Sequence, residues 1–206
     1  MKNIKVLLRA MIAGVMISIG GTIYLSLENK MLGAFLFSVG LFSICVNSYN
    51  LYTGKIGYII DNKKNYIIEL LFTLIGNLIG TVMCGYLLSL SRVGTKLKEA
   101  ATIICDIKLN DNLLSIFVLS VFCGIIMYMA VDIYKKVNDF GKYVGIFMGI
   151  TIFILAGFEH CVANMFYFSV ANMWSWKTVL YVFVMVLGNS TGSIMLALGN
   201  KFGLKK

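Results

Sequence analysis

One stretch of the sequence decides the fold: Gly157-Phe158-Glu159-His160-Cys161-Val162-Ala163-Asn164. It lies inside an apolar segment, residues 143–170, that is longer than the roughly 20 residues a helix needs to cross a bilayer. The chain contains no proline, so a break in a membrane helix has to come from small and polar residues such as these. Backbone groups freed by such a break need a protein or water partner at membrane depth. The stretch therefore predicts a membrane helix that is interrupted near its middle by a polar site.

The composition of the whole chain is typical of a membrane protein. Of its 206 residues, 59% are apolar and only 13% are charged, whereas soluble domains average roughly 45–50% and about 25%. A soluble fold of this size would have too little charge to cover its outside. These values exclude a soluble enzyme, a nucleic-acid-binding protein and a disordered chain, and they make the lipid bilayer the expected surroundings.

Six apolar segments are long enough to span a bilayer. They comprise residues 6–27, 32–49, 66–90, 113–134, 143–170 and 178–199. The sequence thus predicts an all-α membrane protein with six transmembrane helices in a single transmembrane domain, residues 1–206. The five cysteines show no Cys-x-x-Cys pair and no Cys/His spacing of a zinc site, so neither a metal nor a cofactor is expected.

The distribution of positive charge predicts the orientation. The net charge is +9, and most of the 18 lysines and arginines lie before the first segment, after the second and fourth segments, and after the sixth. Positively charged loops stay on the cytoplasmic side of a membrane. Both termini are therefore expected in the cytoplasm, with the chain embedded in the inner or plasma membrane. Residues 92–111 are expected to form an extracytoplasmic connecting loop.

The two halves of the chain repeat each other. The Gly-Asn-x-x-Gly motif at residues 76–80 of the third segment returns at residues 188–192 of the sixth, and Gly14 in the first segment parallels Gly124 in the fourth. A second polar interruption, residues 47–54, ends the second segment. Three spans in each half give the two copies opposite orientations, so we predict inverted repeats at residues 1–91 and 112–200 with interrupted second and fifth helices. The site of such a protein lies near the midplane, where the interrupted helices meet.

Polar residues in the two interruptions are the candidate site. His160 is the single histidine of the chain, and Thr53 in the other interruption offers a hydroxyl that can face the same point. A neutral imidazole has one donor and one acceptor, and its ordinary pKa lies close to physiological pH. His160 is therefore expected to hold a small anion or to give it a proton. The alternative is a buried histidine that only bridges helices.

A second group of polar residues is expected to support the broken helices. An ionisable group at membrane depth is costly unless it is paired, so a buried carboxyl here is expected to hold freed backbone amides or a neighbouring helix. Asparagines within spans usually tie helices together by hydrogen bonds rather than touch a permeant species. The members of this group are Glu159, Asn164, Asn77 and Asn189.

Residues 157–166, GFEHCVANMF, closely resemble the fifth-helix signature of the formate/nitrite transporter family. Residues 32–41 (LGAFLFSVGL) and 51–54 (LYTG) look like its second helix and the Ω-loop that follows. Residues 9–14 (RAMIAG) and the Gly-Asn motif of the sixth segment also fit, so the resemblance covers nearly the whole chain. It implies an aquaporin-like six-helix fold, assembled as a homopentamer with one pore per protomer. Such proteins pass small monovalent anions: formate, nitrite, hydrosulfide, acetate or lactate.

The resemblance also implies roles for individual residues. His160 would be the central pore histidine and Thr53 its partner in the Ω-loop. Two positions depart from the family pattern: Tyr52 replaces the usual phenylalanine and adds a hydroxyl, and Cys123 stands before Gly124 where the family often has a lysine. Apolar constrictions above and below the histidine would be formed by Phe37, Leu41, Leu51, Tyr52 and Phe153.

These observations predict a membrane channel for small monovalent weak-acid anions, with proton coupling at His160 and with the anion and the proton as its partners. An aquaporin-like pore for a small neutral solute is the alternative, but paired Asn-Pro-Ala boxes are absent because the chain has no proline. An intramembrane enzyme would pair His160 with Ser169 or Ser193, and neither serine lies in a Gly-x-Ser-x motif. No enzymatic activity is therefore expected. A purely structural membrane protein would carry no flux.

Overall fold

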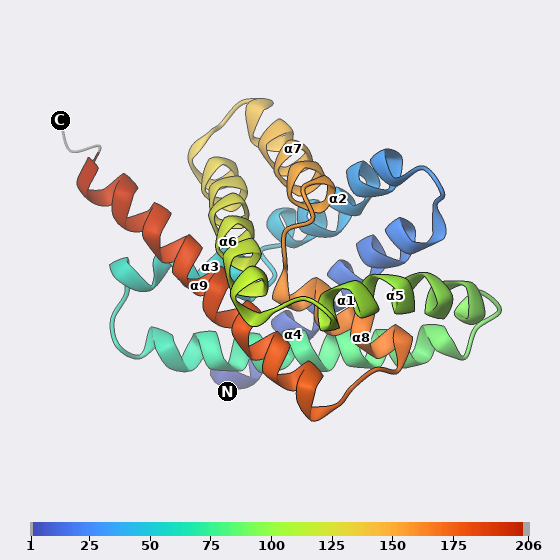
Figure 1. The fold of residues 1–206 in the computed structure, drawn as a ribbon. Coiled ribbons are helices and arrows are strands. Elements are labelled where there is room, and N and C mark those ends of the chain that lie inside the picture. The colour runs from blue at the N-terminus through green and yellow to red at the C-terminus, as the bar shows by residue number, and fades with distance from the viewer. Residues whose placement is uncertain (1, 204–206) are drawn as a thin grey trace.

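The computed structural model describes residues 2–203, and within this range every regular element is a helix. This confirms the predicted all-α fold. In chain order the elements are α1 (Lys2–Ser26), α2 (Lys30–Val46), α3 (Tyr52–Lys55), the 3-10 helix η1 (Ile56–Asp61), α4 (Tyr66–Ser89), α5 (Gly94–Leu109), α6 (Leu113–Lys136), α7 (Gly141–Leu155), α8 (Cys161–Ala171) and α9 (Trp176–Gly203) (Figure 1).

Four helices run through the molecule without a break. α1, α4, α6 and α9 contain 24 to 28 residues each and are apolar enough to cross a membrane. They correspond to the first, third, fourth and sixth predicted segments. α1 packs along α4, and α6 packs along α9, so each half of the chain contributes one long helix pair.

The other two predicted spans are broken. The second is divided into α2 and the short α3 with η1, and the fifth is divided into α7 and α8 (Figure 1). Ser48 and Gly157 lie in these breaks with left-handed φ angles of 54° and 72°, a conformation that commonly ends a helix. No atom lies within 4 Å of the position that a Cβ would occupy at Gly157, so this glycine is required for its backbone angle and not for space. The structure therefore contains the interruptions of the second and fifth helices that the sequence predicts.

The two long helix pairs are packed in the same way. A methyl group at Gly80 of α4 would collide with the carbonyl oxygen of Met11 in α1, and one at Gly192 of α9 would collide with the carbonyl oxygen of Val121 in α6. Backbones this close need a residue without a side chain, as is common between helices in membranes. The glycine motifs of the two halves thus make equivalent contacts.

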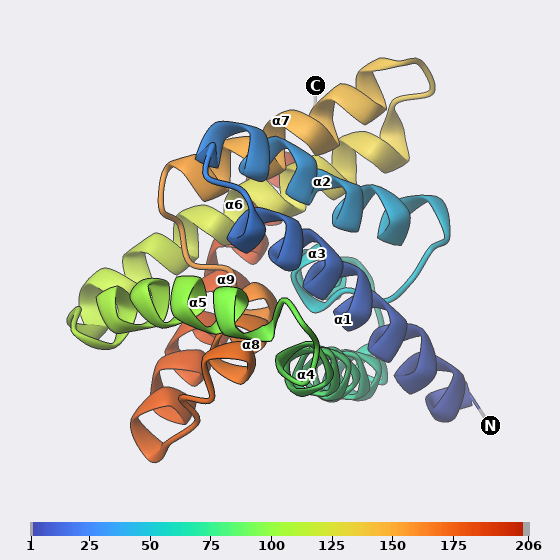
Figure 2. The same ribbon diagram turned by 90° about the vertical axis from the view of Figure 1, so that its right-hand side faces the viewer.

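Residues 92–111, expected to be a connecting loop, are largely a helix. Leu97, Ala101 and Cys105 of α5 are completely buried and lie four residues apart. This spacing gives the helix one apolar stripe, and it packs against α8 and α1. Figure 2 shows α5 lying over α8 on the face of the molecule turned toward the viewer. The expectation of a loop is corrected, because the apolar stripe gives this segment a surface to bury.

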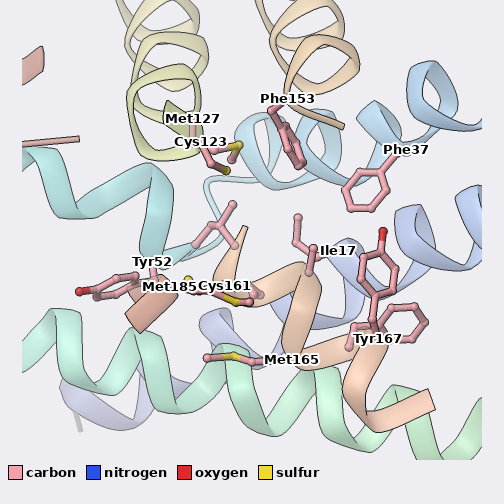
Figure 3. Packing of buried hydrophobic residues seen from close by; sticks show 14 of the residues in the cluster. Ile17, Phe37, Tyr52, Cys123, Met127, Phe153, Cys161, Met165, Tyr167 and Met185 are labelled. Carbon is pink, nitrogen blue, oxygen red and sulfur yellow. The ribbon is translucent and has the colours of Figure 1, made fainter. Parts of the chain in front are cut away.

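The centre of the core is α8. All of its residues are buried, and it contacts α1, α4, α5 and α9. Figure 3 shows Phe37 of α2 close to Tyr167 of α8, with Phe153 of α7 facing Phe37 and Ile17 of α1 between Phe153 and α8. Because the break precedes α8, its polar residues lie in the middle of an apolar core.

Candidate functional site

His160 lies at the start of α8, where the two broken segments meet. It is 2% exposed, and its Nε2 lies 2.8 Å from Oγ1 of the fully buried Thr53 in α3. Its Nδ1 accepts the backbone N–H of Ala163 at 3.0 Å and thereby caps α8. With Nδ1 as an acceptor, the neutral ring carries its hydrogen on Nε2 and donates it to Thr53. The structure thus brings together the two residues that are expected from the sequence to face one point.

Asn77 of α4 holds the break of the second span. Its Oδ1 accepts the backbone N–H of Tyr52 at 2.9 Å. Its Nδ2 donates to the carbonyl oxygens of Asn50 and Ala10, both at 2.8 Å. Asn77 is fully buried, so one amide satisfies a donor and two acceptors that water cannot reach.

Asn189 of α9 holds the break of the fifth span with the same three contacts. Its Oδ1 accepts the backbone N–H of Cys161 at 2.9 Å, and its Nδ2 donates to the carbonyl oxygens of Glu159 and Ser120 at 2.8 Å. Asn189 is also fully buried. Both asparagines therefore tie helices to the broken segments, as expected from the sequence, and these contacts use both N–H hydrogens of each amide.

Glu159 forms a buried ion pair with Lys108 of α5. The ammonium donates to both carboxylate oxygens, at 2.7 and 2.8 Å, and the two side chains are 5% and 13% exposed. Glu159 therefore holds a neighbouring helix, one of the two roles expected from the sequence. Lys108 was not among the predicted site residues, because its segment was expected to be a connecting loop. The available signal was its position three residues after Cys105 and seven after Ala101, on one face of a helix.

Asn164 supports Glu159 from one turn further along α8. Its Nδ2 donates to Oε2 of Glu159 at 2.7 Å and lies 3.2 Å from the sulfur of Met185. Its Oδ1 is buried and has no hydrogen-bond partner among residues 2–203. Buried polar groups are rarely left unpaired, so this oxygen is an acceptor available to a small hydrogen-bond donor.

Aromatic rings cover His160 on one side. The ring centroids of Phe153 and His160 lie 5.6 Å apart. Phe37 meets Phe153 edge-on with centroids 6.2 Å apart, as Figure 3 shows for these two rings. Phe37 and Phe153 come from α2 and α7, the apolar halves of the two broken spans. Both are buried, so the polar pair is flanked by an apolar wall.

Two cavities border the broken segments. The first, here called the α5 pocket, has a volume of about 230 Å³ and is lined by Lys108, Phe153, Glu159 and His160, among others. The second, here called the basic pocket, has a volume of about 530 Å³ and is lined by Leu41 and Leu51, with basic side chains around them. Those basic residues are Lys2, Lys5, Arg9, Lys55 and Lys135.

The two cavities are separated by buried apolar residues. Within the described chain no residue lines both of them. His160 borders the α5 pocket alone, whereas the basic pocket reaches Leu41 and Leu51, which are 0% and 2% exposed. The structure therefore places Phe153 at the α5 pocket, and Leu41 and Leu51 at the basic pocket.

Tyr52 lines neither of these two cavities. Its hydroxyl lies 2.9 Å from Oγ of Ser190 in α9, and the Ser190 hydroxyl in turn donates to the carbonyl oxygen of Val186 at 2.6 Å. The extra hydroxyl noted in the sequence is thus engaged with α9. In this structure Leu41 and Leu51, and not Tyr52, border the basic pocket.

A bundle of apolar helices, two of them broken near one buried histidine that borders a cavity, defines a multi-pass membrane protein of the channel and transporter class. The family model for the formate/nitrite transporter matches residues 1–201. The chain belongs to the formate/nitrite transporter family, which confirms the resemblance seen in residues 157–166.

Characterised relatives are distant in sequence. The chain is 26% identical over 186 residues to the formate channel FocB of Escherichia coli K12, a match that covers 80% of this chain and 65% of that protein. It is 25% identical over 236 residues to the formate-nitrite transporter of Plasmodium falciparum 3D7, covering 95% of this chain and 76% of that one. The chain thus spans slightly less than two thirds of the length of the bacterial relative.

Solved structures share the fold over almost the whole chain. A pentameric formate channel with formate bound superposes with a TM-score of 0.81 at 22% identity, covering 98% of this chain and 97% of the other. A second structure, described as an FNT family ion channel, gives a TM-score of 0.80 at 20% identity, covering 98% and 89%. At these identities the likeness establishes the fold.

Proposed function

We propose that this protein is a channel for small monovalent weak-acid anions such as formate, nitrite or hydrosulfide, with proton coupling at His160. One observation carries the proposal: the buried hydrogen bond of 2.8 Å between His160 Nε2 and Thr53 Oγ1 at the end of the α5 pocket. Family membership and the relatives named for formate support the substrate class. The related pentameric formate channel supports a homopentamer, and the cavities within a single chain support one pore in each protomer.

The aromatic wall gives the proposed pore its selectivity. An anion that moves from the α5 pocket past Phe153 loses water against an apolar surface, and the polar groups at the break replace part of that hydration, as in selectivity filters generally. Thr53 accepts the hydrogen of His160 Nε2, so its own hydroxyl hydrogen is free to point at the anion. The pair then acts as a single donor aimed at the permeant ion.

Proton coupling requires a local change at the start of α8. The neutral ring has no vacant nitrogen, because Nδ1 accepts from Ala163 and Nε2 donates to Thr53. A second proton on Nδ1 would oppose the N–H of Ala163, so that contact has to open. The charged ring can then pass its Nε2 proton to Thr53 Oγ1 while the threonine hydroxyl gives its hydrogen to the anion. The products are a neutral acid and a neutral histidine.

We place the basic pocket at the cytoplasmic end of the pore and α5 at the opposite end, in the inner or plasma membrane. The basic pocket is lined by lysines and an arginine from α1, α3 and α6, and such residues collect on the cytoplasmic side. Both termini then lie in the cytoplasm. In Figure 1 the first turn of α1 and the last turn of α9 lie in the left half of the molecule, and α5 lies in the right half.

The proposal is tested by His160→Asn in proteoliposomes. Asparagine is a good N-cap and can still accept the N–H of Ala163, but it does not titrate. We expect formate uptake driven by a proton gradient to fall roughly a hundredfold, the range typical of removing a positioned proton donor. Uptake is measured from about pH 5.5 to about pH 7.5, on both sides of the ordinary histidine pKa.

Controls separate this function from the alternatives. Unchanged uptake in His160→Asn, with the wild type active, would remove the histidine from the mechanism. A panel of nitrite, hydrosulfide, acetate and lactate ranks the anions. Osmotic swelling with water, ammonia or glycerol, and no anion uptake by the wild type, would instead support a pore for neutral solutes.

A further inference from the structure

The Lys108–Glu159 ion pair lies on the wall of the α5 pocket beside His160. We infer that Lys108 determines charge selectivity: it neutralises Glu159, so that an anion rather than a cation reaches the histidine from this side. The inference rests on the proposed function, since it names the group that admits the anion. Lys108 is a positioning residue here, because it acts through Glu159.

The geometry ties the ammonium to the carboxylate and to nothing else. Lys108 Nζ donates to Oε1 and Oε2 of Glu159, at 2.8 and 2.7 Å, and has no other hydrogen-bond partner within residues 2–203. Oε2 also accepts from Asn164 at 2.7 Å. Removing one partner of a buried ion pair leaves the other charge uncompensated. The pairing therefore fixes the local charge as well as the position of α5.

The charged residues that line the α5 pocket show how the Lys108–Glu159 pair affects the charge of its wall. Within the described chain its ionised lining residues are Lys108, Glu159 and Asp111. The carboxylate of Asp111 accepts hydrogen bonds from the Ser115 hydroxyl and the Asn112 backbone N–H, with no cation among its partners in residues 2–203. Without Lys108 the wall would carry only carboxylates, and like charge across a low-dielectric pocket excludes an anion.

The rest of α5 holds the lysine in place. Leu97, Ala101 and Cys105 bury one face of the helix, and Lys108 continues that face after one further turn. α5 packs on α8, the helix that begins one residue after His160. The helix therefore brings a cation to the pore, whereas the break itself, residues 156–160, contains no lysine or arginine.

A comparison with the first break shows why a lysine such as Lys108 is needed only at the second break. In the first break Asn77 binds the carbonyl oxygen of Asn50, and in the second break Asn189 binds that of Glu159. Asn50 is therefore the counterpart of Glu159. Asn50 is neutral, and its amide donates to the carbonyl oxygen of Val6 at 3.2 Å. A neutral residue at this place needs no counter-ion, so the carboxylate of Glu159 creates the need for Lys108.

The test uses the full-length protein reconstituted in vesicles and planar bilayers, with sodium formate as the probe. We expect Lys108→Met to lower formate uptake about tenfold and to move the reversal potential toward that of sodium, because a charged wall shifts ion preference. Lys108→Met/Glu159→Gln removes both charges of the pair, so the net charge of the wall is the same as in the wild type. It is expected to return both readouts to within about threefold of the wild type, as for a coupled pair. Lys96→Met, at an exposed position of the same helix, is the matched control and should change neither.

Each outcome decides the inference. It is overturned if Lys108→Met transports formate like an active wild type, or if the double variant stays as impaired as Lys108→Met. If Lys108→Met does not fold, the double variant still decides, since loss of its formate preference overturns the inference. A wild type that carries no formate, nitrite or hydrosulfide would refute the proposed function itself, whereas normal flux in Lys108→Met refutes only the role of the lysine.

Discussion

The two broken helices share one backbone arrangement and differ in charge. In each half a buried asparagine makes the same three hydrogen bonds to the break. By these contacts Asn50 and Leu51 of the first break correspond to Glu159 and His160 of the second. The first pair is neutral and non-titrating, and the second is ionisable throughout. The repeat therefore supplies the scaffold, and the positions where the halves differ supply the chemistry.

The same correspondence explains why only one hydrogen bond between a hydroxyl and an imidazole, that of Thr53 with His160, joins the two breaks within residues 2–203. Thr53 is the second residue of α3, and its counterpart in α8 is Val162. Thr53 meets His160, whereas the counterparts Val162 and Leu51 are both apolar. A symmetric site would hold two hydroxyl–imidazole pairs. This one holds a single pair, with Leu51 bordering the basic pocket on the other side.

The largest effect is expected when a break loses its asparagine. Asn189→Leu leaves the N–H of Cys161 and the carbonyl oxygens of Glu159 and Ser120 buried without their partner. We expect a loss of roughly 3 kcal/mol or more in stability, since each unpaired buried group costs about 1–3 kcal/mol. Thermal unfolding of the purified protein in detergent measures this loss.

The equivalent variant in the other half tests whether the two asparagines contribute equally to the stability of the protein. Asn77→Leu should destabilise the protein as much as Asn189→Leu, because the three lost contacts are the same in kind. Asn138→Leu, at an exposed position, is the control for the change in residue type. A markedly milder loss for Asn77→Leu would show that the first break is held by other contacts.

The sequence predicted the features that repeat or alternate along the chain. The apolar segments, the two interruptions and the glycine motifs are local patterns, and the meeting of Thr53 with His160 follows from placing two such interruptions face to face. The Lys108–Glu159 pair joins residues 51 positions apart. Its formation depends on how α5 lies on α8, so local composition placed Lys108 in a loop. The direction of the Tyr52 hydroxyl depends in the same way on Ser190, 138 positions away.

A smaller effect is expected when the single polar contact is removed. Thr53→Val keeps the shape of the side chain and loses the hydroxyl that accepts from His160 Nε2. We expect formate uptake to fall about tenfold, the usual effect of losing one hydrogen bond of about 1.4 kcal/mol. Thr53→Ser retains the hydroxyl and should stay close to the wild type. Val162→Thr adds a hydroxyl at the counterpart position, where no imidazole faces it, and should not raise uptake. Normal flux in Thr53→Val would remove Thr53 from the site.

The smallest effect is expected at Tyr52, where the sequence suggested a modified constriction. Tyr52→Phe removes the contact with Ser190 and leaves the ring in place, at a cost of about 1 kcal/mol in stability. Because Tyr52 borders neither the α5 pocket nor the basic pocket, its hydroxyl is not on the path that we propose for the anion. Formate uptake should therefore stay within about twofold of the wild type, a difference of less than 0.5 kcal/mol in a rate barrier. A tenfold change would contradict this path. It would mean that the Tyr52 ring moves into the anion path during transport, so that the first break contributes a mobile side chain and the second break a charged one.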